Sequence, residues 1–187
     1  MALKRIKAEL AELRRDPPPG CTAAPNGTDY FQWTGSIEGP PGTPYEGGLF
    51  NVRITFPQSY PLKPFTVTLT TRIFHPNISE LGAICDHKWC NKWSASVTVK
   101  EVLWSVWQLM IQPDEANPVD TNIGSLYTKN RKNFNETARH WTLQHAYPPA
   151  GYVFTTTQTT TSPANNQDSA GTGGSGSESE ASDTTKG

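Results

Sequence analysis

The sequence predicts an α+β fold followed by a low-complexity tail, and three observations carry that prediction. Apolar residues recur at helical spacing in residues 3–15, alternate with polar residues between residues 30 and 70, and return to helical spacing from residue 98 to residue 145. Strands grouped in one block, with helices before and after it, are typical of α+β domains. A chain of 187 residues has room for one such domain and a tail.

The first element is an amphipathic helix over residues 3–15. Its apolar residues lie three or four positions apart and so share one face: Leu3, Ile6, Leu10 and Leu13. The proline-rich run 16–20 ends the helix. The first fifteen residues carry five basic and two acidic side chains, which predicts either a solvated basic face or contact with an acidic partner.

Three strands are expected next, because apolar and polar residues alternate with a period of two. The clearest strand covers residues 50–56, residues 66–70 alternate in the same way, and residues 30–37 do so more weakly. The connecting segments 39–42 and 57–61 are rich in glycine and proline, which predicts turns.

Helical spacing returns at residues 98–111. Thr98 and Glu101 have the spacing of a capping box, and the apolar residues that follow predict a buried central helix. A short helix is expected near residues 121–129 and a final helix near residues 131–145.

The composition changes at residue 148. Residues 151–187 contain nine Thr, six Ser and six Gly, with a net charge of −3. Such a segment buries too little apolar surface to offset the entropy of ordering. We therefore expect one domain over residues 1–147 and a disordered Thr/Ser/Gly-rich acidic tail over residues 148–187.

Charge and hydropathy exclude several classes of function. The net charge of −1 gives no basic footprint for nucleic acid. No apolar run approaches the roughly 20 residues that span a membrane, and the N-terminal residues have no apolar segment typical of a signal peptide. We expect a soluble cytoplasmic or nuclear protein that contacts neither membrane nor nucleic acid. The odd number of cysteines, three, argues against a disulfide framework.

Residues 71–97 have no clear periodicity but hold the candidate chemistry. Cys85, His87 and Cys90, with His75, could ligate one zinc ion, although the usual paired spacings are absent. The cysteines could instead be small buried side chains, or one of them could be a nucleophile. Spacing alone does not choose between these three interpretations.

A set of motifs, in order along residues 1–147, resembles the ubiquitin-conjugating enzyme family, and most closely its short class that works with many ubiquitin ligases. The motifs that carry the resemblance are Met1-Ala2-Leu3-Lys4-Arg5-Ile6, Pro44-Tyr45-Glu46-Gly47-Gly48, Phe56-Pro57-Gln58-Ser59-Tyr60-Pro61-Leu62-Lys63-Pro64, His75-Pro76-Asn77-Ile78, Gly82-Ala83-Ile84-Cys85 and Trp93-Ser94.

The resemblance implies a four-stranded antiparallel sheet flanked by helices. It makes Cys85 the acceptor of ubiquitin from a ubiquitin-activating enzyme, as a thioester, which the lysine of a substrate protein then attacks with the help of a RING or HECT ubiquitin ligase. No cofactor or metal is implied, since ATP is used upstream.

The resemblance also gives roles to the active-site loop. Asn77 either donates to the developing oxyanion or braces the loop, and both roles stay open. His75 and Pro76 are expected to be structural, with His75 hydrogen-bonded inside the loop.

Two positions depart from the class. His87 stands two residues after Cys85, where an acid is usual, and Asn117 stands near the incoming lysine, where Asp is usual. The resemblance implies that such acids orient the lysine and assist the desolvation that lowers its pKa. Their absence puts lysine transfer in doubt more than thioester formation.

The docking surfaces implied by the resemblance are partly altered. Arg5, Lys63 and Ser94 match the ligase-binding surface, whereas Leu62 replaces an aromatic residue and Ala95 replaces a proline. The basic first helix matches the surface that meets the activating enzyme, through Lys4, Arg5 and Lys7.

Two alternatives remain within the resemblance. One is a scaffold of the same fold that binds ligases or ubiquitin but transfers ubiquitin poorly. The other is an enzyme for a ubiquitin-like modifier instead of ubiquitin.

Overall fold

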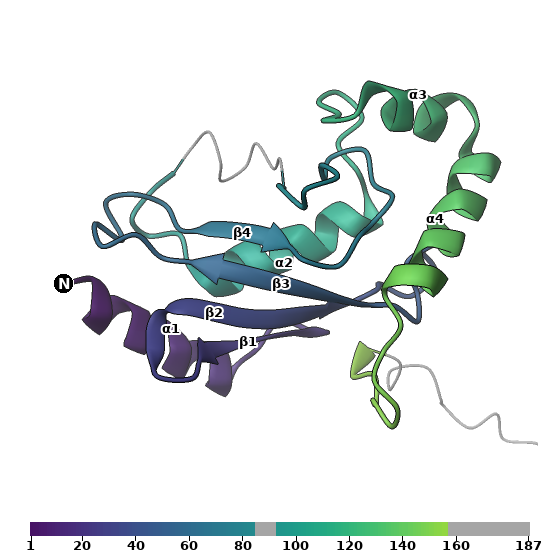
Figure 1. Ribbon diagram of the computed structural model, residues 1–187. Coiled ribbons are helices and arrows are strands. Elements are labelled where there is room, and N and C mark those ends of the chain that lie inside the picture. Colours follow the sequence, from purple (N-terminus) through teal and green to yellow (C-terminus); the bar gives the residue numbers. More distant parts are fainter. Residues whose placement is uncertain (85–92, 157–187) are drawn as a thin grey trace, which may run out of the picture.

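The computed structural model describes residues 1–84 and 93–156 (Figure 1). Within these residues it contains a four-stranded antiparallel sheet and four helices. Their order along the chain is α1 (Ala2–Arg15), β1 (Cys21–Asn26), β2 (Asp29–Glu38), β3 (Leu49–Thr55), β4 (Thr66–Leu69), α2 (Val99–Ile111), α3 (Thr121–Lys129) and α4 (Arg131–His145). The α+β fold predicted from the sequence is therefore confirmed.

The sheet has the strand order β1-β2-β3-β4, so each strand pairs with its neighbour in sequence. In register, Trp33 lies opposite Ile54, and Ile54 lies opposite Val67. These three side chains are buried on one face and join a single core with Leu10 of α1 and Leu103 of α2. The other face of the sheet is polar. As Figure 1 shows, α3 and α4 lie beside one end of the sheet.

The helices begin and end close to the predicted residues. Thr98 is the N-cap of α2: its hydroxyl accepts from the N–H of Glu101 at 3.2 Å, and its own N–H donates to the Glu101 carboxylate at 2.9 Å. The predicted capping box is thus confirmed. None of the helices in the described part of the chain is long and apolar enough to cross a membrane.

Strand β1 has no counterpart among the strands expected from periodicity. It contains Pro25 and only weakly apolar residues, so its alternation is not visible in the sequence. The usable signal was Asn26-Gly27, because this dipeptide favours a tight hairpin turn, and Gly27 does adopt a positive φ of 60°.

The described part of the expected tail is residues 148–156, and it differs from the expectation. This segment turns back toward the sheet, where Tyr152, Thr155 and Thr156 donate hydrogen bonds to the carboxylate of Glu38. This part of the segment contains Tyr152, Val153 and Phe154, and it packs against the domain. Residues 157–187 lie outside the described part of the chain.

Candidate active site

Pro76 joins two segments that are distant in sequence. Its carbonyl oxygen accepts hydrogen bonds from the backbone N–H of Val119 at 2.7 Å and of Asp120 at 3.2 Å. The segment that follows β4 is thereby held against the loop between α2 and α3. Because proline has a fixed φ and no N–H, Pro76 shapes the turn and contributes only this carbonyl to the contact.

Asn77 is fully buried and uses all the polar atoms of its side chain on the same loop. Nδ2 donates to the carbonyl oxygens of Asp114, at 2.8 Å, and of Asn117, at 3.0 Å, while Oδ1 accepts from the N–H of Asp114 at 2.9 Å. A side-chain amide carries two N–H donors, and both are engaged here. In this geometry Asn77 braces loop 114–117.

His75 is also fully buried, and both of its ring nitrogens have partners. Nδ1 accepts from the N–H of Asn77 at 3.0 Å, so the proton is assigned to Nε2, which donates to the carbonyl of Leu109 at 3.0 Å. Burial lowers the pKa of His75 to about 4, against the opposing effect of the Leu109 carbonyl. His75 is therefore neutral near pH 7, and its unprotonated nitrogen, Nδ1, is already occupied by the N–H of Asn77, which does not suit a zinc ligand.

Asp114 is an acidic residue that sequence reasoning missed. Its carboxylate accepts from Nδ2 of the exposed Asn117 at 2.9 Å and from the N–H of Ala116 at 3.0 Å. Loop 114–117 therefore carries a carboxylate next to Asn117, the position at which the resemblance implies that an acid is usual. The signal in the sequence was the spacing Asp114-x-x-Asn117, which allows a side-chain contact across a tight turn.

The chain is fixed immediately before Cys85. Ile84 forms an antiparallel bridge with Ile78, the residue after Asn77, and the N–H of Ser79 donates to the carbonyl of Ala83 at 2.9 Å. Gly82 closes this turn with a φ of 79°, and an added Cβ would lie 1.8 Å from the carbonyl oxygen of Leu69. The last described residue before Cys85 is therefore anchored beside Asn77.

The two cysteines of the candidate site lie outside the described residues. Cys85, His87 and Cys90 all lie in the segment 85–92, so the zinc and nucleophile hypotheses for them remain predictions. The remaining cysteine, Cys21, is buried, and burial raises the pKa of its thiol to about 12. Since the thiolate is the nucleophilic form, Cys21 does not suit nucleophilic chemistry.

Apart from Arg5 on α1, the predicted ligase-binding residues lie on two loops joined by Trp93. Leu62 is 82% exposed, and Lys63, Ser94 and Ala95 are exposed as well. The indole N–H of Trp93 donates to the carbonyl of Pro61 at 2.9 Å, and its ring packs on buried aromatic side chains below. The structure therefore brings the two loops together into one surface.

Glu9 is a second residue that the sequence analysis missed. Its buried carboxylate accepts from Nε of Arg5 at 2.7 Å, from the hydroxyl of Tyr60, and from the N–H of Val99 at 2.8 Å. The hydrogen bond to Glu9 raises the pKa of Arg5. Arg5 also reaches the carbonyl of Val97 at 3.4 Å. Glu9 therefore ties α1 to the loop of Tyr60 and to the start of α2, while Arg5 reaches the second loop of the predicted ligase surface.

The other basic residues of α1 face solvent. Lys4 and Lys7 are exposed, and Nζ of Lys7 lies 5.0 Å from the centre of the Tyr30 ring. Their position leaves both ammonium groups accessible, as contact with an acidic partner surface would require. Arg5 differs from them because it is half-buried and engaged with Glu9.

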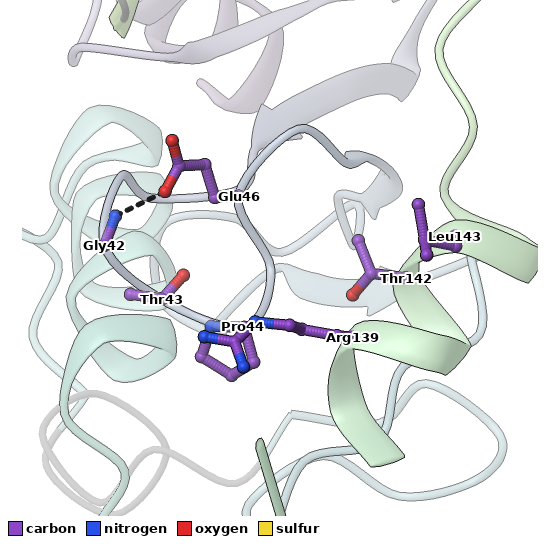
Figure 2. A pocket seen from close by; sticks show the side chains of 7 residues that line it. All are labelled: Gly42, Thr43, Pro44, Glu46, Arg139, Thr142 and Leu143. Carbon is purple, nitrogen blue, oxygen red and sulfur yellow. Dashed lines mark hydrogen bonds between the residues drawn. The ribbon is translucent and has the colours of Figure 1, made fainter. Parts of the chain in front are cut away.

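A pocket of about 320 Å³ lies away from these residues, between the loop that precedes β3 and α4 (Figure 2). It is lined by Gly42, Thr43, Pro44, Glu46, Arg139, Thr142 and Leu143. Within the loop, the N–H of Gly42 donates to the Glu46 carboxylate at 2.8 Å. No predicted site residue lines this pocket, so the candidate active site is the surface around Asn77 and loop 114–117.

Comparison with known proteins identifies the family of this chain. A family profile for ubiquitin-conjugating enzymes matches residues 5–142. The chain belongs to the ubiquitin-conjugating enzyme family.

Two solved structures are similar to it. A ubiquitin-conjugating enzyme E2 domain from Toxoplasma gondii is 36% identical, with a TM-score of 0.71, over 77% of this chain and 98% of that one. A structure from Plasmodium yoelii, described as a ubiquitin-conjugating enzyme, is 37% identical, with a TM-score of 0.73, over 79% of this chain and 96% of that one.

Proposed function

We propose that the chain accepts ubiquitin from a ubiquitin-activating enzyme as a thioester on Cys85, and then transfers it to a substrate lysine with a RING or HECT ubiquitin ligase. The observation that carries the proposal is the brace from Asn77 to loop 114–117, which lies beside the anchored residue that precedes Cys85. Family membership supports the general class of partner: ubiquitin, an activating enzyme and a ligase.

The transfer step needs positioning more than strong base catalysis. The lysine amine attacks the thioester carbonyl, the new C–N bond forms, the C–S bond to Cys85 breaks, and the proton lost by the amine balances the released Cys85 thiolate through the solvent. A thioester is already activated, so the gain comes from holding amine and carbonyl in line. We assign Asn77 to that positioning, because both of its N–H groups hold the loop that would flank the incoming amine.

Asp114 offers a carboxylate for the same step. It lies on the braced loop and contacts Asn117, the residue aligned with the family's usual acid. A carboxylate near the amine orients it as an ammonium ion before deprotonation. We propose that Asp114 partly supplies the charge that Asn117 lacks.

The test is thioester formation by the full chain with ubiquitin, a ubiquitin-activating enzyme and ATP, followed by electrophoresis without reductant. We expect one band shifted by a single ubiquitin, lost on addition of thiol and absent in Cys85→Ala. Cys90→Ala is the matched control, because it removes the neighbouring cysteine and should still be charged. Loss of the band in Cys90→Ala but not in Cys85→Ala would contradict the assignment.

A second candidate, the scaffold, is favoured by Asn117 and His87. It predicts normal charging of Cys85 but almost no discharge onto free lysine, and single-turnover discharge separates the two functions. Failure of charging with ubiquitin, but success with a ubiquitin-like modifier and its own activating enzyme, would redirect the proposal to that modifier.

A further inference from the structure

Glu38, the last residue of β2, has an environment that the proposed transfer chemistry does not use. Its side chain is only 1% exposed. The donors to its carboxylate all come from one segment near the C-terminal end of the described chain: the hydroxyl of Tyr152 at 3.1 Å, the N–H and hydroxyl of Thr155 at 2.8 and 3.1 Å, and the N–H and hydroxyl of Thr156 at 3.0 and 2.7 Å.

Those donors are neutral, and none of the ion pairs found among the described residues includes Glu38. Burying a carboxylate without a cation is unfavourable unless hydrogen bonds replace its water. Burial raises the pKa of Glu38, but the hydrogen bonds from Thr155 and Thr156 outweigh it, so the pKa ends below its usual value. The segment therefore supplies the solvation that the buried carboxylate needs.

The backbone beside Glu38 is shaped to admit the same segment. Gly20 has a φ of 68°, and its carbonyl accepts from the N–H of Glu38 at 2.7 Å. A Cβ added to Gly20 would lie 2.8 Å from Cγ2 of Thr156 and 3.2 Å from Cβ of Glu38. Only a residue without a side chain leaves room for Thr156 at this place.

We propose that Glu38 and Gly20 form a peptide-anchoring site, and that its ligand is the chain's own segment Tyr152–Thr156. The class of ligand is a peptide that presents two consecutive backbone N–H groups together with hydroxyl side chains. The anchor directs the C-terminal extension away from the end of α4 and back to the β1–β2 side of the sheet, as the path of the chain in Figure 1 illustrates. Thr156, the last described residue, lies beside Gly20.

The experiment is residue-resolved amide hydrogen exchange on the full-length protein. In the wild type, the amides of Thr155 and Thr156 should exchange at least about tenfold more slowly than unprotected amides, because both are hydrogen-bonded. In Glu38→Gln that protection should be lost, since the replacement amide presents a donor to other donors. Glu80→Gln, which changes an exposed acid, should keep it.

The amides of Val52 and Ile54 in β3 report whether the sheet is intact. If Glu38→Gln unfolds the sheet, Thr156→Val provides the second variant, because it removes one donor and keeps the side-chain shape. It should weaken protection at Thr155 while β3 stays protected.

Unprotected Thr155 and Thr156 amides in the wild type would overturn the proposal. Protection that survives both Glu38→Gln and Thr156→Val would overturn it too. Because this readout involves no ubiquitin, its outcome is independent of the transfer function proposed above.

Discussion

Asn77 and Glu38 have the same structural role but different chemistry. Each is a buried polar side chain that holds a segment distant in sequence. Asn77 is neutral, and its donors and acceptor are matched one to one by loop 114–117. Glu38 is charged, only accepts hydrogen bonds, and depends on donors from a segment outside the region that matches the family.

The difference shows which changes weaken each contact. A neutral amide with complete partners does not respond to pH, and it fails only when a partner or the amide itself is removed. A buried carboxylate responds to protonation and to the loss of any donor, because its charge needs them all. The side-chain contacts of Asn77 therefore contain no titrating group of their own, whereas the anchor of the extension depends on one.

The largest expected effect is that of Asn77→Ala. It leaves the N–H of Asp114 and two carbonyls without their partner, so we expect a loss of about 3 kcal/mol in the free energy of unfolding. Discharge onto lysine should slow at the same time. Urea unfolding and single-turnover discharge measure the two effects.

Asn117→Ala is the matched control, because its exposed amide makes one side-chain contact with Asp114. Its cost in stability should stay below about 1 kcal/mol. A drop in the discharge rate of Asn77→Ala with unchanged stability would contradict the brace and favour oxyanion donation instead.

The next effect is a pH dependence set by His75 beside the brace. Its folded pKa of about 4 lies below the ordinary value of 6.5. The unfolded chain therefore takes up a proton first as the pH falls. Stability should be full above pH 6.5 and fall as the pH drops toward 4, by about 2 kcal/mol at pH 5. Chemical unfolding at several pH values measures this.

His75→Gln should remove most of that slope, because a glutamine side chain does not titrate. If the variant keeps the slope of the wild type, another group is responsible for it.

The anchor should matter less to the domain than the brace does. We expect Glu38→Gln to lower the free energy of unfolding by about 1–2 kcal/mol at pH 7, from lost charge-assisted hydrogen bonds. Since the folded pKa of Glu38 is lowered, this contribution is present above its unfolded value of 4.5 and fades as the pH falls further. Urea unfolding of Glu38→Gln, with Glu80→Gln as the control, measures this loss in the free energy of unfolding. A loss in the free energy of unfolding as large as that of Asn77→Ala would contradict the expected difference between the two sites.

The smallest effect concerns the chemistry of the braced loop. Asp114→Asn keeps a hydrogen-bond acceptor but removes the charge, so we expect discharge onto free lysine to slow about three- to tenfold, with charging unchanged. Glu115→Gln is the matched control, because it neutralises the adjacent exposed acid, whose ion pair among the described residues is with Arg131 at 3.5 Å. Equal rates for the two variants would remove Asp114 from the mechanism.

The sequence was informative where contacts are local or periodic. Thr98 with Glu101, the alternation in β3 and the apolar face of α1 follow from spacing alone. The motif around Asn77 singled out this residue in the sequence, but it left open which partners the amide binds. Those partners lie 37 and 40 residues further on, and only folding brings them together.

Glu9 and Glu38 could not be foreseen for the same reason. Each reads as an ordinary acid in the sequence, yet each is buried and satisfied by donors that lie far along the chain. The separation is 90 residues for Glu9 and Val99, and 118 residues for Glu38 and Thr156. No pattern of spacing or composition reports contacts at that distance.

The contact between Glu38 and Thr156 also bears on the order in which the protein folds. It closes a loop that contains β3, β4 and the helices from α2 to α4, and closing so long a loop in an unstructured chain costs about 4 kcal/mol in entropy. Once the sheet and α4 are in place, the two ends are already close, and most of that cost has been met. Docking of the extension should therefore be a late step in folding and an early one to be lost.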